Sequence, residues 1–301
     1  MAAFRLGLIG AGRMGRTHLR ALSSSEQVRI IAAADPSPEA WAALGAAGLT
    51  VFRDVEALLQ AGRLDGVLIA APSGRHLDLV AQVAAAGLPI LCEKPCGLTS
   101  AEAREAASVA AAAGVTLQVA YWRRFVPALQ VLRRRIADGE LGGIYFAACF
   151  QWDGVPPASE FRAGSGGIFI DMGVHEFDQL RWLTGQELTA VHAAASRAGG
   201  ETAIPGDAES AQALCELSGG STGLVSLGRR HPLGDVCWVQ VFGTGGVEES
   251  RFLWPPHGEE AFLQALRWQA EGFAAQARGG VGIGANALDA AAALHAAEQA
   301  S

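Results

Sequence analysis

The chain has 301 residues, a formal net charge of −7 at pH 7, and 50% hydrophobic residues. This length exceeds that of a usual single domain and predicts two domains. The acidic balance argues against nucleic-acid binding, which requires a concentrated basic surface. Arg, Asp or Gly interrupts the apolar runs well before the roughly 18 residues that a membrane span needs, so we expect no membrane partner.

The N-terminal sequence enters a strand-like stretch directly, without the basic, apolar and small-residue segments of a secretory signal. We therefore expect a cytoplasmic protein. The five cysteines are scattered and lack a metal-ligand spacing, which predicts buried free thiols and no bound metal. They are Cys92, Cys96, Cys149, Cys215 and Cys237.

Short apolar runs alternate with alanine-rich helical stretches up to about residue 120. This rhythm predicts parallel strands joined by crossover helices, in a sheet covered on both faces. Asp54 is a candidate cap for one helix, and Thr99 or Ser100 for another. The expected strands are Arg5–Ile9, Val28–Ala34, Gly66–Ala70, Pro89–Cys92 and Thr116–Val119. Residues 1–120 are therefore expected to form an α/β domain.

After residue 121 the rhythm changes. A helix to about Asp138, a strand over Ile144–Gln151, an irregular Gly/Pro stretch and a helix from about Ile170 are expected. Several strand-like runs follow without long helices between them, which predicts an α+β domain with a largely antiparallel open sheet over residues 121–301. The clearest runs and the two closing helices are Ala208–Leu217, Ser221–Leu227, Val236–Phe242, Glu259–Arg278 and Asn286–Gln299.

A glycine-rich turn, Gly10-Ala11-Gly12-Arg13-Met14-Gly15, separates the first expected strand from a helix. Such glycines permit a tight turn and the close approach of a pyrophosphate, which the helix N-terminus attracts. Asp35 lies 20 residues beyond Gly15, where its carboxylate can accept hydrogen bonds from both ribose hydroxyls. Together these signals predict a Rossmann domain that binds NAD rather than NADP. A glycine turn used for packing alone, or for S-adenosylmethionine or FAD, is the alternative.

The residues expected to contact the cofactor follow several strand ends. Ser73 and His76, after the strand Gly66–Ala70, could contact the nucleotide or cap the next helix. The full expected set is Gly10, Gly12, Arg13, Met14, Gly15, Asp35, Ser73, His76, Glu93 and Lys94.

Two further features point to proton transfer. Asp171 and His175 are four residues apart and would share one face of a helix. Histidine suits reversible proton transfer near neutral pH, and a carboxylate can orient its ring, although a capping Asp with a core His gives the same spacing. Lys94 follows a strand end, where its ammonium could hold a reacting oxygen or could be an ordinary surface charge.

Three segments, in order along the chain, resemble the Gfo/Idh/MocA oxidoreductase family, in the manner of inositol 2-dehydrogenases. They are Glu93-Lys94-Pro95, Tyr121-Trp122-Arg123-Arg124-Phe125-Val126-Pro127, and the segment from Gly166 to His175. The resemblance implies that Lys94 and His175 are catalytic, that Asp171 supports them and that Arg124 faces the substrate. It also implies that the open sheet makes oligomer contacts, so we expect a homodimer or homotetramer.

The expected reaction is hydride transfer between NAD and a secondary alcohol or ketone of a small polyol or sugar, inositol-like or aldose-like. Trp152 is a candidate because an indole can stack on a sugar ring. The residues expected at the substrate are Lys94, Arg124, Trp152, Asp171 and His175. Two alternatives stay open. One is glycoside hydrolysis through transient oxidation by tightly held NAD, and the other is a catalytically silent NAD-binding regulatory protein.

Overall fold

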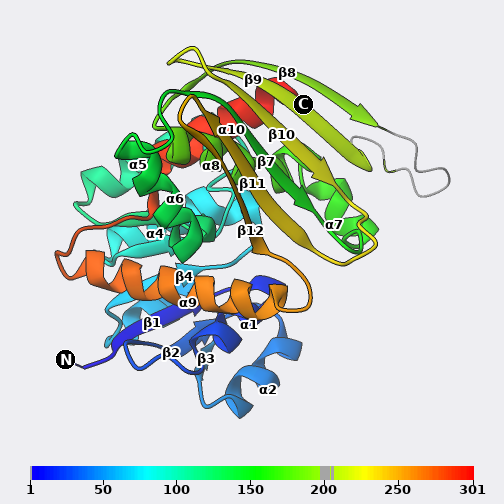
Figure 1. The fold of residues 1–301 in the computed structure, drawn as a ribbon. Coiled ribbons are helices and arrows are strands. Elements are labelled where there is room, and N and C mark those ends of the chain that lie inside the picture. The colour runs from blue at the N-terminus through cyan, green and yellow to red at the C-terminus, as the bar shows by residue number, and fades with distance from the viewer. Residues whose placement is uncertain (1, 197–203, 205–206) are drawn as a thin grey trace. The chain divides into compact units, whose positions relative to one another are not determined.

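The computed structural model describes residues 2–196, 204 and 207–301. The chain divides into two compact units, each built around its own sheet (Figure 1). Unit 1 comprises Met1–Trp122 and Leu263–Ala291, and unit 2 comprises Arg123–Phe262 and Ala292–Ser301. The sequence assigned every residue after 120 to the second domain, whereas residues 263–291 return to unit 1.

Among the described residues, unit 1 has a seven-stranded sheet in the order β13-β6-β5-β4-β1-β2-β3. Neighbouring strands run parallel, except that β13 pairs antiparallel with β6. The strands are β1 (Phe4–Ile9), β2 (Val28–Ala34), β3 (Thr50–Phe52), β4 (Gly66–Ile69), β5 (Ile90–Cys92), β6 (Leu117–Val119) and β13 (Ala285–Asn286). The predicted parallel α/β sheet is confirmed, while β3 and β13 were not predicted. The strand order reverses beside β1, and ligands bind at such a switch point, outside the carboxyl ends of the strands.

The helices of unit 1 follow the expected crossovers. They are α1 (Arg13–Leu22), α2 (Pro38–Ala46), α3 (Val55–Gln60), α4 (His76–Ala85) after the 3-10 turn η1 (Ser73–Arg75), α5 (Ser100–Ala112) and the larger part of α9 (Gly258–Ala277). Two predicted caps are confirmed: Asp54 accepts from the Ala57 N–H at 2.8 Å and Thr99 from the Glu102 N–H at 3.2 Å. Each satisfies a donor that the helix leaves unpaired, worth about 1 kcal/mol.

Aromatic packing draws α9 into the core of unit 1. Phe273 is fully buried, and its ring meets that of Phe4 edge to face at 5.9 Å. Leu6, Leu8 and Leu68 belong to the same buried cluster. Burying a side chain of this size stabilises the fold by roughly 1.5–3 kcal/mol. The unit that α9 joins is therefore decided by a contact between residues far apart in the sequence, Phe4 and Phe273. The periodicity of the helix does not reveal this contact.

In unit 2 the described residues form a six-stranded sheet in the order β12-β11-β7-β10-β9-β8. All its neighbours are antiparallel except β7 and β10, so the predicted, largely antiparallel sheet is confirmed. Its strands are β7 (Ile144–Trp152), β8 (Leu188–Ser196), β9 (Ser210–Leu217), β10 (Thr222–Gly228), β11 (Val236–Gly243) and β12 (Gly246–Leu253). The other elements are the 3-10 turn η2 (Trp122–Phe125), α6 (Pro127–Ala137), α7 (Ser159–Gly164), the π-helical turn η3 (Phe169–Gly173), α8 (Val174–Thr184) and the larger part of α10 (Ala287–Ala300).

The two faces of this sheet differ. On one face α8 packs against β7 and β10 (Figure 1), over buried residues such as Cys149 and Val225. The other face carries polar residues such as Gln240 and Glu249, and several of its apolar side chains are half-buried or exposed, including Leu214 at 49% and Val247 at 58% exposure. Ring contacts run along this face, for example the stacked pair Phe150 and Trp238 at 4.2 Å. We call it the open face; its larger apolar residues are Phe146, Phe150, Leu214, Leu224, Trp238, Phe242 and Val247.

Candidate functional site

The glycine turn between β1 and α1 uses its three glycines differently. Gly10 has φ of +92°, and a Cβ there would lie 2.7 Å from the Ala70 carbonyl oxygen. A Cβ on Gly15 would lie 2.1 Å from the Gly10 carbonyl oxygen. A Cβ on Gly12, by contrast, would meet no atom of the described chain within 4 Å. Gly10 and Gly15 therefore serve backbone packing, and Gly12 leaves the N-terminus of α1 open to an approaching phosphate.

Asp35, at the end of β2, is fixed beside this turn. Its Oδ2 accepts from the Ala11 N–H at 2.6 Å, and its Oδ1 accepts from the Ser37 N–H at 2.8 Å. An ionised carboxylate has about four acceptor positions, so both oxygens retain capacity for ribose hydroxyls. Arg13 and Met14 open α1 next to it. The turn and the carboxylate thus fit a dinucleotide whose ribose lacks a 2′-phosphate.

Lys94 follows β5 at the same edge of the sheet, in the segment that we call the lysine loop (residues 93–97). Glu93 is buried; its Oε1 lies 2.6 Å from His18 Nε2, and its Oε2 accepts from the Lys94 N–H at 3.2 Å. Burial would raise the pKa of the Glu93 carboxyl, but His18 and the Lys94 charge hold it below its ordinary value. Glu93 therefore links α1 to the backbone of Lys94 through its two carboxylate oxygens.

His76 holds the lysine loop from the other side. Its Nδ1 lies 2.7 Å from the carbonyl oxygen of Pro95, and its Nε2 lies 2.8 Å from that of Ala71. The ring is buried at the start of α4 and links the segment after β4 to the lysine loop. Ser73 lies in η1, where no side-chain cap is formed at either η1 or α4 among the described residues. His76 is thus placed as a link between two loops.

Asp171 and His175 lie in unit 2 at a change of helical type. Asp171 is in the π-helical turn η3, and His175 is in the first turn of α8. A π-turn contains one residue more than an α-turn and is frequent at functional sites. The two residues therefore do not lie on one regular α-helix. The direction of the Asp171 side chain depends on its contacts. Both residues are nearly buried, with 8% and 6% exposure.

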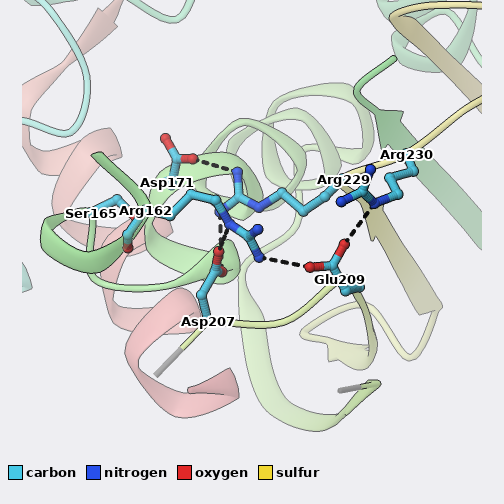
Figure 2. Close-up of polar contacts among 7 residues, drawn as sticks. All are labelled: Arg162, Ser165, Asp171, Asp207, Glu209, Arg229 and Arg230. Atoms are coloured by element: carbon cyan, nitrogen blue, oxygen red, sulfur yellow. Dashed lines mark hydrogen bonds and ion pairs between the residues drawn. The ribbon is translucent and has the colours of Figure 1, made fainter. Parts of the chain in front are cut away.

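A series of alternating charges leads away from Asp171 (Figure 2). Arg229, fully buried after β10, donates to Asp171 Oδ2 at 2.7 Å and to Asp207 Oδ1 at 3.1 Å. Arg162 of α7 donates to Asp207 at 2.6 Å and to Glu209 at 3.1 Å. We call this series the charge ladder; its members are Asp171, Arg229, Asp207, Arg162, Glu209 and Arg230.

The predicted substrate residue Arg124 is engaged by α8. Its Nε donates to Asp178 Oδ2 at 3.0 Å and its Nη2 to the other carboxylate oxygen, and both side chains are buried. The neighbouring Arg123 forms a second buried ion pair with Glu176. Such two-point pairs fix the direction of a guanidinium, so α8 and the segment that carries Arg124 are held together.

Trp152 ends β7 and lies against Gly228, where a Cβ would come within 2.1 Å of the indole. The next residue, Asp153, is partly buried. Burial and the nearby Asp235 carboxylate raise its pKa to about 6, with Gln151 and Arg229 opposing the shift and Asp171 adding to it. The corner formed by the ends of β7 and β10 thus gathers acidic and basic groups beside Trp152.

The structure adds residues to which the sequence analysis assigned no individual role. His18, Asp207 and Arg229 form buried polar contacts with the predicted residues or with their neighbours. His18 occurs within α1, where it resembles any helical histidine. Arg229 is part of an Arg-Arg-His run that could equally be a surface. The available signal for Arg229 was a charged residue directly after an otherwise apolar strand, but this signal does not indicate which residue the charge pairs with.

Unit 1 gathers the glycine turn, Asp35, Ser73, His76, Glu93 and Lys94 at the carboxyl ends of its parallel strands. Unit 2 carries Arg124, Trp152, Asp171 and His175. Across the described ranges no helix is long and apolar enough to cross a membrane, and no group of three or more His, Cys, Asp or Glu is arranged to hold a metal.

Comparison with known proteins bears on both units. Residues 4–121 match the oxidoreductase family with an NAD-binding Rossmann fold, and residues 129–248 match the GFO/IDH/MocA C-terminal domain. The chain is 56% identical over 301 residues to the rhizopine catabolism protein MocA of Rhizobium meliloti, covering 100% of this chain and 95% of that protein. It is 34% identical over 247 residues to the inositol 2-dehydrogenase of Rhizobium meliloti strain 1021, covering 81% and 74%.

A solved structure from Sinorhizobium meliloti 1021, provisionally assigned as a myo-inositol dehydrogenase, superimposes with a TM-score of 0.92 at 31% identity. The superposition covers 99% of this chain and 96% of that one. The expected family is thereby confirmed over both units, and with it the expected cofactor, NAD. The chain belongs to the Gfo/Idh/MocA family of NAD-dependent oxidoreductases.

Proposed function

We propose that the protein oxidises a ring hydroxyl of an inositol-like polyol to a ketone, with reduction of NAD to NADH. The observation that carries the proposal is the position of Lys94, fixed on both sides at the sheet edge that also carries the glycine turn and Asp35. The names of the relatives, inositol 2-dehydrogenase and rhizopine catabolism protein, support the substrate class.

Bound NAD would supply the acceptor for the hydride that leaves the carbon bearing the reacting hydroxyl. The N-terminus of α1 with Gly10, Gly12, Arg13, Met14 and Gly15 would hold the pyrophosphate, and Asp35 the adenosine ribose. The expected cofactor contacts are completed by Ser73, His76, Glu93 and Lys94. The carboxylate of Asp35 would repel a 2′-phosphate, so NADP should bind more weakly than NAD.

Three side chains would serve the reacting group. His175 takes up the hydroxyl proton at a ring nitrogen as the hydride leaves the carbon. Lys94 donates a hydrogen bond to the reacting oxygen and stabilises the charge that develops on it. Asp171 orients His175, Lys94 or both. Because Lys94 belongs to unit 1 and the other two residues to unit 2, their convergence on one substrate is part of this proposal.

The proposal extends to the surroundings of the reaction. Arg124 and Trp152 are assigned to the polyol, the first as a guanidinium that faces the substrate and the second by stacking. A homodimer or homotetramer would cover the apolar open face of unit 2, which few monomers expose. We also infer a cytoplasmic location, which suits the buried free thiols of all five cysteines. A predominant monomer in a sedimentation experiment at micromolar concentration would overturn the predicted oligomer.

The direct test is NADH formation with a panel of inositols, aldoses and anhydrosugars, each with NAD and with NADP. Stoichiometric NADH and ketone from an inositol would support the proposal. Release of an aglycone from a glycoside without net NADH would favour the hydrolytic alternative instead. NAD binding with no turnover across the panel would favour a regulatory protein, and a clear preference for NADP would overturn the role of Asp35.

A further inference from the structure

Arg229 connects the predicted catalytic carboxylate to the interior of unit 2. Its side chain is fully buried, and both terminal nitrogens donate to carboxylates, one on Asp171 and one on Asp207 (Figure 2). Its backbone N–H also donates to the Glu209 carbonyl oxygen at 2.8 Å, which continues the pairing of β9 with β10. The arginine is therefore held at its backbone and at both ends of its guanidinium.

We propose that Arg229 is a positioning residue that fixes the orientation of the Asp171 carboxylate for hydride transfer. This inference rests on the proposed function, in which Asp171 orients His175 or Lys94. Arg229 itself acts through Asp171 and is not assigned a contact with the reacting atoms.

The local backbone explains why a positioning residue is needed. Asp171 lies in the π-helical turn η3, whereas His175 lies in the regular helix α8. The change of helical type between them means that the four-residue spacing alone does not set their relative direction. A short, charge-assisted hydrogen bond from a buried guanidinium supplies that direction and also stabilises the buried negative charge.

The remaining members of the charge ladder hold Arg229 in turn. Asp207 is shared between Arg229 and Arg162, and burial would raise its pKa, but the hydrogen bond from Arg162 and the charge of Arg229 hold it below its ordinary value. A planar guanidinium can bridge two carboxylates at once, whereas a lysine ammonium acts as a single point of charge. The geometry therefore specifies arginine at position 229.

The test compares Arg229→Gln with Arg229→Lys and with a matched control, Arg135→Gln. Arg135 also bridges two carboxylates of unit 2, Glu140 and Glu248, but at a partly exposed surface position. Turnover, KM, NADH affinity and the melting temperature are measured for each variant. The Asp171 carboxylate is also located in a crystal structure of Arg229→Gln.

For Arg229→Gln we expect turnover to fall by about a hundredfold, the usual scale for a misplacement of about 1 Å in a reacting group. KM and NADH affinity should stay near those of the unmodified protein, and Arg229→Lys should recover part of the turnover. Asp207→Asn leaves the bond between Arg229 and Asp171 in place. This variant should lower the melting temperature, but its turnover should fall much less than that of Arg229→Gln. Arg135→Gln should change neither.

Two results would overturn the inference. One is normal turnover in a folded Arg229→Gln variant. The other is a loss of turnover that follows the melting temperature equally in Arg229 and Asp207 variants, since this marks a purely structural arginine. If the unmodified protein oxidises no polyol, the proposed function fails, but the crystal structure still decides whether the Asp171 carboxylate turns away without Arg229. An unmoved carboxylate would refute the positioning role.

Discussion

The lysine loop and the charge ladder hold their predicted catalytic residues by different physical means. In the lysine loop, the Glu93 carboxylate and the His76 ring bind the backbone around Lys94. In the ladder, the Arg229 guanidinium binds the Asp171 carboxylate directly and also binds Asp207, which continues the series. Loss of a contact in the loop releases a backbone segment, whereas loss of a ladder member leaves a buried charge without its partner. The second kind of loss is more costly to stability.

Replacing the predicted catalytic residues should break both regions most strongly. We expect Lys94→Ala and His175→Ala to lower turnover by roughly a hundredfold to ten-thousandfold, the range for loss of a general acid or base. The melting temperature of both variants, and the NAD affinity of His175→Ala, should remain close to those of the unmodified protein. Steady-state kinetics with the polyol found in the panel would measure this. Near-normal turnover in either variant would withdraw the role of that residue.

Removing a ladder member distant from the reaction separates stability from catalysis. Arg162→Gln removes the arginine that lies closest to Asp207 among its described contacts, at 2.6 Å against 3.1 Å for Arg229. Breaking a buried ion pair costs about 3–5 kcal/mol. Because the pKa of Asp207 is depressed in the folded protein, this stabilisation is present above its unfolded value near 3.8 and is lost as pH falls through the lower folded value. Denaturant unfolding at pH 7 and pH 3 should show a smaller deficit at the lower pH. An equal deficit at both would indicate lost packing instead.

The same two regions show what the sequence could predict. The dinucleotide turn and Asp35 were identified because parallel strands place successive carboxyl ends at one edge, so local sequence order carries the geometry. Lys94 was identified through the resemblance of its segment to the family, since its position alone also fits a surface charge. The ladder was not identified, because Arg229 and Asp171 are brought together by the pairing of distant strands and by the packing of η3 on β10. The return of α9 to unit 1 was missed for a similar reason, the contact of Phe273 with Phe4.

A smaller change should loosen the lysine loop without touching Lys94. In His18→Asn the shorter side chain cannot span from α1 to Glu93, so the backbone at Lys94 loses one support. We expect turnover to fall by about tenfold, the equivalent of one net hydrogen bond of about 1.4 kcal/mol. The control is His295→Asn on α10, whose side chain is 58% exposed. A decrease in melting temperature with unchanged turnover would show that His18 supports only the fold.

The smallest expected effect concerns Asp153, near the ladder but outside it. Its pKa rises from 3.8 to about 6 on folding, so the ionised form is penalised in the folded protein. The penalty is therefore complete above about pH 6, declines as pH falls, and vanishes below the unfolded value. A shift of this size corresponds to at most about 3 kcal/mol, and partial exposure reduces the expected gain from Asp153→Asn to about 1 kcal/mol.

Thermal unfolding should show a larger stabilisation by Asp153→Asn at pH 8 than at pH 5. If the variant is instead less stable at pH 8, the ionised carboxylate must be stabilised there, and the charges at the end of β10 act on it more strongly than its burial does.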